Sequence, residues 1–418
     1  MNYNKFANQM KELVIDFGIK LSDNLHKPMR KFVIEMIFGI TASKSILLSN
    51  IARSLDETIS IKETDDRLSE NLDRISDKLP TIWQNYRQNI KQYINEDTLF
   101  NIDDTDIIKP LGKHFEASCK VIDGSSKDKK LVNGYPVTEI VAITKNNSHP
   151  VSVYSNVYST ITPDFKSVNV ETDEALDSIY ASFGNVGTVV MDRGYDDSKR
   201  MNYFLNKDWN FIIRGKFNRN VIYQGKESNV LDFAYEYKGK ISIKVHLKRK
   251  AVTRKCSYFK VRLRGVKKPV YLVIVYFKGE AAIFYTNREI NCKKDVIKVV
   301  SDYFKRWRVE EYFKFKKQEY GFENFRVRSL KKINALNVLL SMAINMVGTQ
   351  TEIESNLSYI LMELSKPIKT QVYFNYYRIS AGVKELFKYL RDKLYNLLRK
   401  SRQKEKQLSL FLDIFDIQ

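Results

Sequence analysis

The sequence predicts an α/β protein whose core is a mixed sheet, flanked at both ends by helical regions. Three observations predict this class. Segments with the alternation typical of strands begin near residue 97 and are interleaved with helical segments. Apolar residues recur at helical spacing before residue 97 and after about residue 331. The chain has 418 residues, 43% of them hydrophobic, which suits two or three domains with a sizeable core.

Residues 1–96 are predicted to form a helical domain that binds DNA. In PMRKFVIEMIFGITASKSILLSNIARSL, one helix is expected to end at Gly39, because glycine favours the C-cap, and Ser43 is expected to cap the next. Short helices joined by tight turns suit a helix-turn-helix DNA reader, and they suit any small helical bundle equally well.

Residues 97–330 are predicted to form the α/β core. The strand candidates are TLFNIDD, EIVAIT, PVSVYS and GTVVMD. Alternation along TLFNIDD places Asp104 on the same side as Phe100 and Ile102, and Asp103 on the other side.

Within this core, residues from about 215 to 288 are rich in strand candidates and strongly basic. In ISIKVHLKR and FKVRLRGV, the outward positions carry like charges at Lys244, Lys260, Arg262 and Arg264. Two such strands would give a sheet with one apolar and one cationic face, which suits a phosphate backbone. The alternative is an ordinary solvated face.

Residues 331–418 are predicted to be helical again, with NALNVLLSMAINMVG as an apolar helix. The sequence leaves open whether these helices pack on the core or form a dimer contact.

Charge and cysteine usage restrict the function classes. Lys and Arg outnumber Asp and Glu by 70 to 49, a formal net charge of +21, so the expected partner is a polyanion; the alternative is a cationic surface kept for solubility. The cysteines Cys119, Cys256 and Cys292 lack metal-ligand spacing and do not suggest a disulfide framework. No signal peptide and no apolar run of ~18 residues is found, so we expect a cytoplasmic protein without a membrane span.

Three carboxylates are the candidate catalytic groups. Asp104 and Asp192 each end a strand candidate, and Glu310 lies in a helical stretch that Gly321 stops. On one continuous helix, Glu310 shares a face with the residues Tyr303, Arg306 and Lys317. Two acids at strand ends and one on a helix can hold two divalent ions, and Mg²⁺ suits such oxygen ligands. Taken alone, each acid could instead be a cap or turn residue, and the helix face a solvated stripe.

At these positions the sequence resembles the insertion-sequence DDE transposases, which have a ribonuclease H-like core. Their third acidic motif, Y-(2)-R-(3)-E-(6)-K, is matched at every spacing by Tyr303, Arg306, Glu310 and Lys317. The second motif, D-R-G-Y-D, begins at Asp192, and the first, an acid followed by Thr or Ser, is matched by Asp104-Thr105. Asp103 and Asp106 lie close to the first motif, and we choose Asp104 because it precedes the hydroxyl residue.

The resemblance implies a transposase that cuts DNA at insertion-sequence ends and joins them to target DNA. It implies that Asp104, Asp192 and Glu310 bind two Mg²⁺ ions, for which Mn²⁺ is expected to substitute. Tyr303, Arg306 and Lys317 would hold DNA phosphates beside the scissile bond. The family's β-rich insertion is associated with a hairpin intermediate and cut-and-paste movement; Tyr223, Tyr235, Tyr237 and Tyr258 all qualify as base-stacking residues.

The resemblance also implies a homodimer in the DNA complex and a bacterial, nucleoid-associated protein. The rival functions are a ribonuclease H-like nuclease without strand transfer and a non-catalytic DNA-binding regulator.

The C-terminal tail carries a further motif. Gln407, Leu408, Ser409, Leu410 and Phe411 resemble the pentapeptide with which bacterial proteins dock on the DNA polymerase sliding clamp. Leu410 and Phe411 would fill a pocket and Gln407 would orient the peptide. The alternative is that these apolar residues pack as a closing helix or strand.

Overall fold

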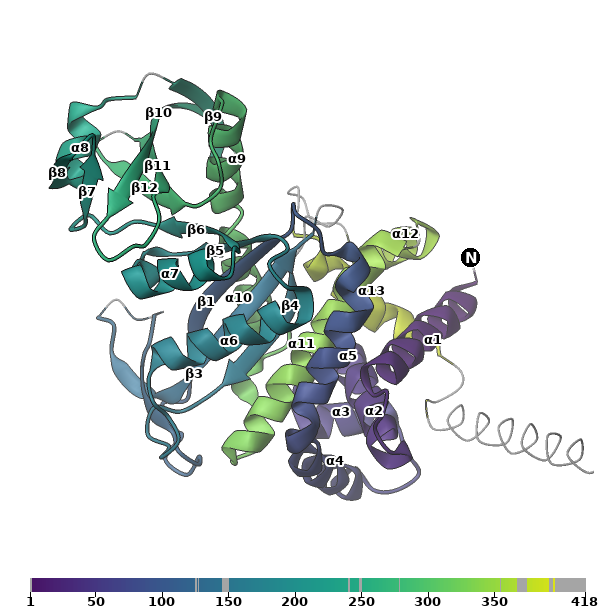
Figure 1. Ribbon diagram of the computed structural model, residues 1–418. Helices are drawn as coiled ribbons and strands as arrows, with labels where there is room; N and C mark the ends of the chain where they lie inside the picture. Colours follow the sequence, from purple (N-terminus) through teal and green to yellow (C-terminus); the bar gives the residue numbers. More distant parts are fainter. Residues whose placement is uncertain are drawn as a thin grey trace, which may run out of the picture.

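The computed structural model describes residues 2–124, 126, 128–144, 150–239, 241–247, 250–277, 279–353, 355–366, 374–390 and 394. In this part of the chain the predicted α/β class is confirmed. Twelve strands form a mixed sheet, and a helical body built from both ends of the chain lies beside it (Figure 1).

The N-terminal region is helical, as expected. Its helices are α1 (Tyr3–Leu21), α2 (Lys27–Ser43), α3 (Leu48–Leu55), α4 (Ile61–Ile75) and α5 (Leu79–Ile90). The expected helix end at Gly39 is wrong: α2 continues past it and ends before Lys44, which adopts the left-handed conformation at φ 53°. Gly39 instead allows α3 to approach closely, because a Cβ there would lie 2.4 Å from Cγ2 of Ile51.

The sheet is continuous from the core into the β-rich insertion. Its strands are β1 (Leu99–Ile108), β2 (Cys119–Ile122), β3 (Leu131–Ile143), β4 (Val151–Val157), β5 (Thr188–Met191), β6 (Asn210–Arg214), β7 (Asn220–Tyr223), β8 (Lys226–Asn229), β9 (Ile241–Leu247), β10 (Lys250–Leu263), β11 (Val270–Tyr276) and β12 (Ala281–Thr286). They follow the order β2-β3-β1-β5-β6-β12-β11-β10-β7-β8, with β4 paired to β3 and β9 to β10. The pairs β1–β5 and β5–β6 are parallel, and the other pairs are antiparallel.

Helices cover both faces of the sheet. They are α6 (Val168–Phe183), α7 (Ser198–Asn206), α8 (Val230–Glu236), α9 (Lys293–Phe304) and α10 (Trp307–Glu319). On one face, Phe100 of β1 stacks on Phe183 of α6 at 5.7 Å between ring centroids. On the other face, Leu99 and Val190 share a buried cluster with Val296 of α9. Successive residues of these strands therefore point to opposite faces of the sheet, and different helices cover the two faces.

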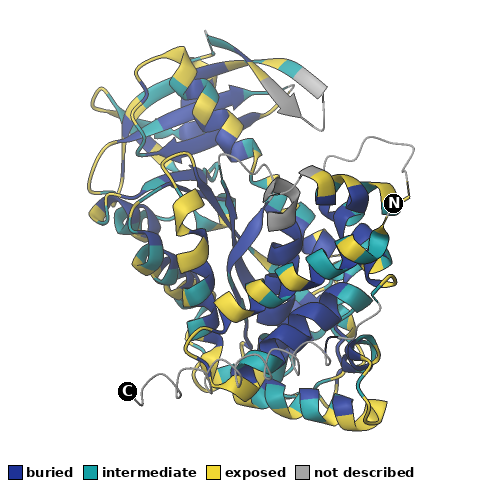
Figure 2. Cartoon of the chain, turned by 90° about the vertical axis from the view of Figure 1, so that its right-hand side faces the viewer, coloured by how far each residue is buried: buried dark blue, intermediate teal, exposed yellow. Residues whose placement is uncertain are grey.

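The C-terminal helices α11 (Leu330–Ile353), α12 (Ser355–Leu364) and α13 (Tyr376–Phe387) pack within the chain. Phe387 of α13 meets Phe38 of α2 at 5.0 Å between ring centroids. Asn345 of α11 donates to the carbonyl of Ser152 on β4 and accepts from its N–H. Figure 2 shows buried residues running through this helical body and into the sheet. These helices therefore join the N-terminal helices to the core.

Among the described residues, no single helix is both long and apolar enough to span a membrane. The bent pair α2 and α3 passes the same test by length and composition alone.

Candidate active site

The parallel pairing of β1 and β5 brings two carboxylates together. Their register places Leu99 opposite Thr188 and Asn101 opposite Val190. Continued by two residues, this register places Asp103 opposite Asp192, which follows the last residue of β5 in an extended conformation. Because alternate residues of a strand share a face, Asp103 and Asp192 lie on the same face of the sheet.

Asp104 lies on the opposite face. It does share a side with Phe100 and Ile102, as expected, but that side faces away from Asp192. Its carboxylate accepts hydrogen bonds from the Thr138 hydroxyl at 2.6 Å and the Tyr195 hydroxyl at 2.8 Å. The structure therefore does not bring Asp104 to Asp192 and Glu310.

Arg306 gathers Asp103, Asp192 and Glu310 around one guanidinium. Its Nη1 lies 2.8 Å from Oδ2 of Asp103, and its Nη2 lies 2.6 Å from Oε1 of Glu310 and 4.0 Å from Oδ2 of Asp192. On the far side of Asp192, the Tyr303 hydroxyl donates to Oδ1 at 3.1 Å. A carboxylate from the middle of β1, one directly after β5 and one on α10 thus surround a single cation. The expected strand end at this point of β1 is wrong, because β1 continues to Ile108.

The electrostatics differ between the two strand acids. Burial raises the pKa of Asp103 to about 6, although the charge and hydrogen bond of Arg306 oppose the shift. Burial would also raise the pKa of Asp192, but the Arg193 N–H, the Arg306 charge and the Tyr303 hydroxyl together hold that pKa below its usual value. Burial next to Asp192 raises the pKa of Tyr303 to about 12, so its hydroxyl remains a donor.

The helical stretch that carries Glu310 is not one continuous helix, contrary to the projection from sequence. It divides into α9 and α10, so that Tyr303 belongs to α9 and Arg306 precedes the first residue of α10. At the junction the chain tightens: Arg306 N–H donates to the Tyr303 carbonyl at 2.9 Å, and Val309 N–H donates to the Arg306 carbonyl at 3.0 Å. The tightened turn still directs Tyr303, Arg306 and Glu310 toward the strand acids.

Lys317 lies apart from this group. Its Nζ donates to the Asp106 carbonyl at 2.5 Å and lies 3.1 Å from Oε1 of Glu323. Lys317 therefore holds the end of β1 to the turn after α10.

The basic side chains of the insertion are exposed but do not form one cationic face. The alternation of β10 is as predicted, with Val261 and Leu263 buried and Lys260 and Arg262 exposed. Arg264 is also exposed, but it follows the strand in a turn and pairs with Glu227. Lys244, however, pairs with Thr253, seven residues earlier on β10 than Lys260. Thr253 is at an odd position of β10 and Lys260 and Arg262 are at even positions, so Thr253 faces the other side of the sheet. Direct antiparallel partners share a face, so Lys244 also faces away from Lys260 and Arg262.

Two residues near the site were not singled out by the sequence analysis. Arg214 ends β6 with its Nη1 3.8 Å from Oδ1 of Asp192; its place at the end of the third parallel strand was a usable signal. Trp307 is 44% exposed at the first turn of α10. In the sequence, the feature that could have drawn attention to Trp307 is its place between two arginines, Arg306 and Arg308.

The donor set fits a hard divalent ion, because Asp103, Asp192 and Glu310 supply only carboxylate oxygens. Within the described residues, however, no three His, Cys, Asp or Glu side chains are gathered closely enough to hold a metal ion as they stand. Arg306 lies between the carboxylates instead.

Residues 156–346, which include Asp192 and Glu310 but not β1, match the family model described as "Transposase DDE domain". The chain therefore contains a transposase DDE domain over these residues, which supports a DNA-cleaving and strand-transferring enzyme in general. No curated protein matches the chain. The chain is also similar to a solved structure described as "piggyBac transposase synaptic complex with hairpin DNA", with 10% identity and a TM-score of 0.44, covering 94% of this chain and 82% of that one.

Proposed function

We propose that this transposase cuts DNA at insertion-sequence ends and joins them to target DNA, using Asp103, Asp192 and Glu310 as its catalytic carboxylates. The observation that carries the proposal is the meeting of these three carboxylates around Arg306. Asp103 replaces the Asp104 expected from sequence, because Asp104 points to Thr138 and Tyr195 on the other face.

The three carboxylates would hold divalent ions, Mg²⁺ by preference and Mn²⁺ as a substitute, and two ions are expected. Such ions activate an attacking water or 3′ hydroxyl and stabilise the leaving oxygen. A divalent ion would compete with the Arg306 guanidinium for Asp103 and Glu310. We therefore expect Arg306 to turn toward a DNA phosphate when the ions bind, since a guanidinium pairs well with phosphate.

Other residues would hold the DNA rather than the ions. Tyr303 orients Asp192 and keeps its proton at neutral pH, so it is available to a phosphate only as a donor. Lys317 would first have to leave Asp106 and Glu323. Lys260 and Arg262 share one exposed face of β10 and are the better backbone contacts of the insertion, with Lys244 on the other face. Arg264 follows the strand and would first have to leave Glu227.

Cut-and-paste movement through a hairpin, a homodimer in the DNA complex and docking on the sliding clamp stay predictions. Among the base-stacking candidates, Tyr223 and Tyr237 are packed against Phe233 and Phe259, and Tyr258 is partly buried, whereas Tyr235 is 56% exposed. An exposed ring suits stacking on a flipped base better than a packed one. The clamp motif, Gln407 to Phe411, lies outside the described residues.

The test is a cleavage and joining assay with the ends of the chain's own element. Wild-type protein should cut the ends and join them to a target duplex only when Mg²⁺ or Mn²⁺ is added. Cleavage without joining would favour the nuclease without strand transfer. DNA binding without cleavage at any metal concentration would favour the regulator. Full cleavage by Glu310→Ala would remove the proposed assignment.

A further inference from the structure

A row of polar side chains crosses four strands on the face that carries the proposed catalytic carboxylates. Ser155 of β4 is the direct partner of Glu139 of β3, and Glu139 is the direct partner of Asp103 of β1. Asp103 in turn lies opposite Asp192 in the continued β1–β5 register. Direct partners share a face, so these four residues form one line beneath α10. The line is buried at the Ser155 end and open at the Asp192 end.

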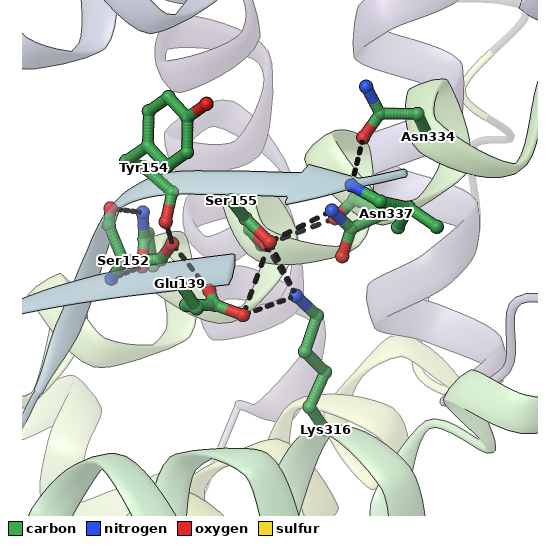
Figure 3. Close-up of polar contacts among 10 residues, drawn as sticks. Glu139, Ser152, Tyr154, Ser155, Lys316, Asn334 and Asn337 are labelled. Atoms are coloured by element: carbon green, nitrogen blue, oxygen red, sulfur yellow. Dashed lines mark hydrogen bonds and ion pairs between the residues drawn. The ribbon is translucent and has the colours of Figure 1, made fainter. Parts of the chain in front are cut away.

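The buried end of the row is paired with a lysine of α10. Lys316 Nζ lies 2.9 Å from Oε2 of Glu139, and neither side chain has any exposed surface. Lys316 also donates to the hydroxyls of Ser341 at 2.9 Å and Ser155 at 3.4 Å. Glu139 accepts from Ser152 at 2.6 Å, and Figure 3 shows these contacts closing around the ion pair. Both charges are therefore compensated without solvent.

One helix thus contacts the row twice. Arg306, the residue directly before α10, contacts Asp103, and ten residues later Lys316 contacts Glu139. Glu310 lies between them, and its described hydrogen bond is to Arg306, with 56% of its side chain exposed. Because few contacts fix the Glu310 side chain itself, its position depends on where α10 lies.

A buried ion pair seldom stabilises a fold more than an apolar pair of the same volume would, but separating its partners is strongly unfavourable. If α10 slid or rotated, Lys316 and Glu139 would part and leave two uncompensated charges in the protein interior. Apolar residues at these positions would tolerate such a shift, because apolar contacts are not directional.

We propose that Lys316 and Glu139 are a positioning pair, which fixes the rotation and depth of α10 and thereby holds Glu310 beside Asp103 and Asp192. The inference rests on the proposed function for its catalytic consequence, but not for the placement of the helix.

The test is the double variant Lys316→Met with Glu139→Gln, compared with each single variant. Each single variant should unfold at a lower temperature, because it leaves one buried charge unpaired. The double variant should recover most of the lost Tm. It should nevertheless cleave at least tenfold more slowly than the wild type at saturating DNA, with unchanged DNA affinity. Amide hydrogen exchange in α10 should be faster than in the wild type at the same temperature.

A matched control applies the same changes to a charge pair whose ion-pair partners all lie outside α10. Glu35→Gln with Arg67→Met removes a pair between α2 and α4 whose glutamate is also buried. Its cleavage rate at saturating DNA and the exchange of α10 should both match the wild type.

The readouts separate this inference from the proposed function. A double variant with wild-type exchange in α10 would overturn the positioning role, whatever its cleavage rate. So would faster exchange combined with wild-type cleavage, provided that Glu310→Ala is inactive. If Glu310→Ala is active while α10 exchanges faster in the double variant, the catalytic assignment fails and the control of helix placement stands.

Discussion

Asp103 and Asp104 are adjacent in sequence, and their side chains lie on opposite faces of β1 with different partners. Asp103 faces α10 and shares a guanidinium with Glu310, whereas Asp104 faces the other side and binds two hydroxyl groups. Asp103 lies beside the positive charge of Arg306, which a divalent ion can replace. Both carboxylate oxygens of Asp104 accept hydrogen bonds from neighbouring hydroxyl groups. The comparison shows that the face of a strand, more than the residue type or its neighbours in sequence, decides which of two adjacent acids reaches Arg306 and Glu310.

The largest expected difference between the two acids is in cleavage. Asp103→Ala should lower the single-turnover rate at least about 10³-fold, because loss of a metal ligand removes several kcal/mol of transition-state stabilisation. Asp104→Asn should stay within about tenfold of the wild type, because its contribution is structural. The rates are measured on a labelled end duplex at saturating Mg²⁺. A dead Asp104→Asn beside an active Asp103→Ala would restore Asp104 to the catalytic set.

Stability should rank the two acids in the opposite order. Asp104→Ala leaves the hydroxyls of Thr138 and Tyr195 without their acceptor, so unfolding in urea should become easier by about 1–3 kcal/mol. Asp103→Ala removes a charge beside Arg306 while Glu310 remains paired with it, so we expect a smaller loss. An equal loss of unfolding free energy in the two variants would mean that the hydroxyl contacts of Asp104 do not stabilise the fold more than the contacts of Asp103 do.

A third test concerns the cation on the Asp103 face. Arg306→Ala should tighten Mn²⁺ binding in the absence of DNA by about tenfold, because removal of a competing charge from a partly buried site is worth on the order of 1 kcal/mol or more. Binding is followed by electron paramagnetic resonance of free Mn²⁺. Arg308→Ala is the control, because Arg308 pairs with Glu311 instead of the strand acids. Weaker Mn²⁺ binding by Arg306→Ala would show that the guanidinium supports the site instead of competing for it.

The smallest expected effect is on the salt dependence of DNA affinity, and it compares the two faces of the sheet at β10. Changing Lys260, Arg262 and Arg264 to Ser should flatten the plot of log affinity against log salt by up to about three units, or about one per lost phosphate contact. Lys244→Ser on the opposite face should change the slope by less than about one unit. Circular dichroism should show an unchanged fold in both. If Lys244→Ser alone gave the larger change, the DNA would run along the other face of the sheet.

Local features of the fold were predictable because short stretches of the sequence encode them. The alternation of β1 and of β10 could be read directly, and so could the helical character of both ends. The pairing of β1 with β5 joins residues about 90 positions apart, and no short pattern encodes it. Alternation therefore showed that Asp103 and Asp104 point to opposite sides, but not which side faces Asp192 and α10.

Other features were missed because their sequence signals are ambiguous. The tightened turn between α9 and α10 contains neither Gly nor Pro, so nothing marks it in the sequence. Lys316 lies in the charged run KFKKQE, which is typical of a solvated helix face, and only the fold shows that it is buried. The Y-R-E-K spacing located Arg306 and Glu310, but the contacts of Lys317 with Asp106 and Glu323 come from the fold.

The continuity of the sheet has a consequence for how the enzyme would measure distance along DNA. Strand β6 ends in Arg214, near Asp192, and its residues Ile212 to Arg214 pair with β12. The sheet continues from β12 through β11 to β10. A rigid hydrogen-bonded path therefore joins the exposed cations of β10 to the carboxylates, with no linker between them. If β10 holds the backbone of a transposon end, the number of nucleotides between that grip and the cut is set by the width of four strands, which is on the order of 15 Å at the usual strand spacing. The cut position would then be a fixed property of the protein backbone, and changes of the terminal bases alone would not move it.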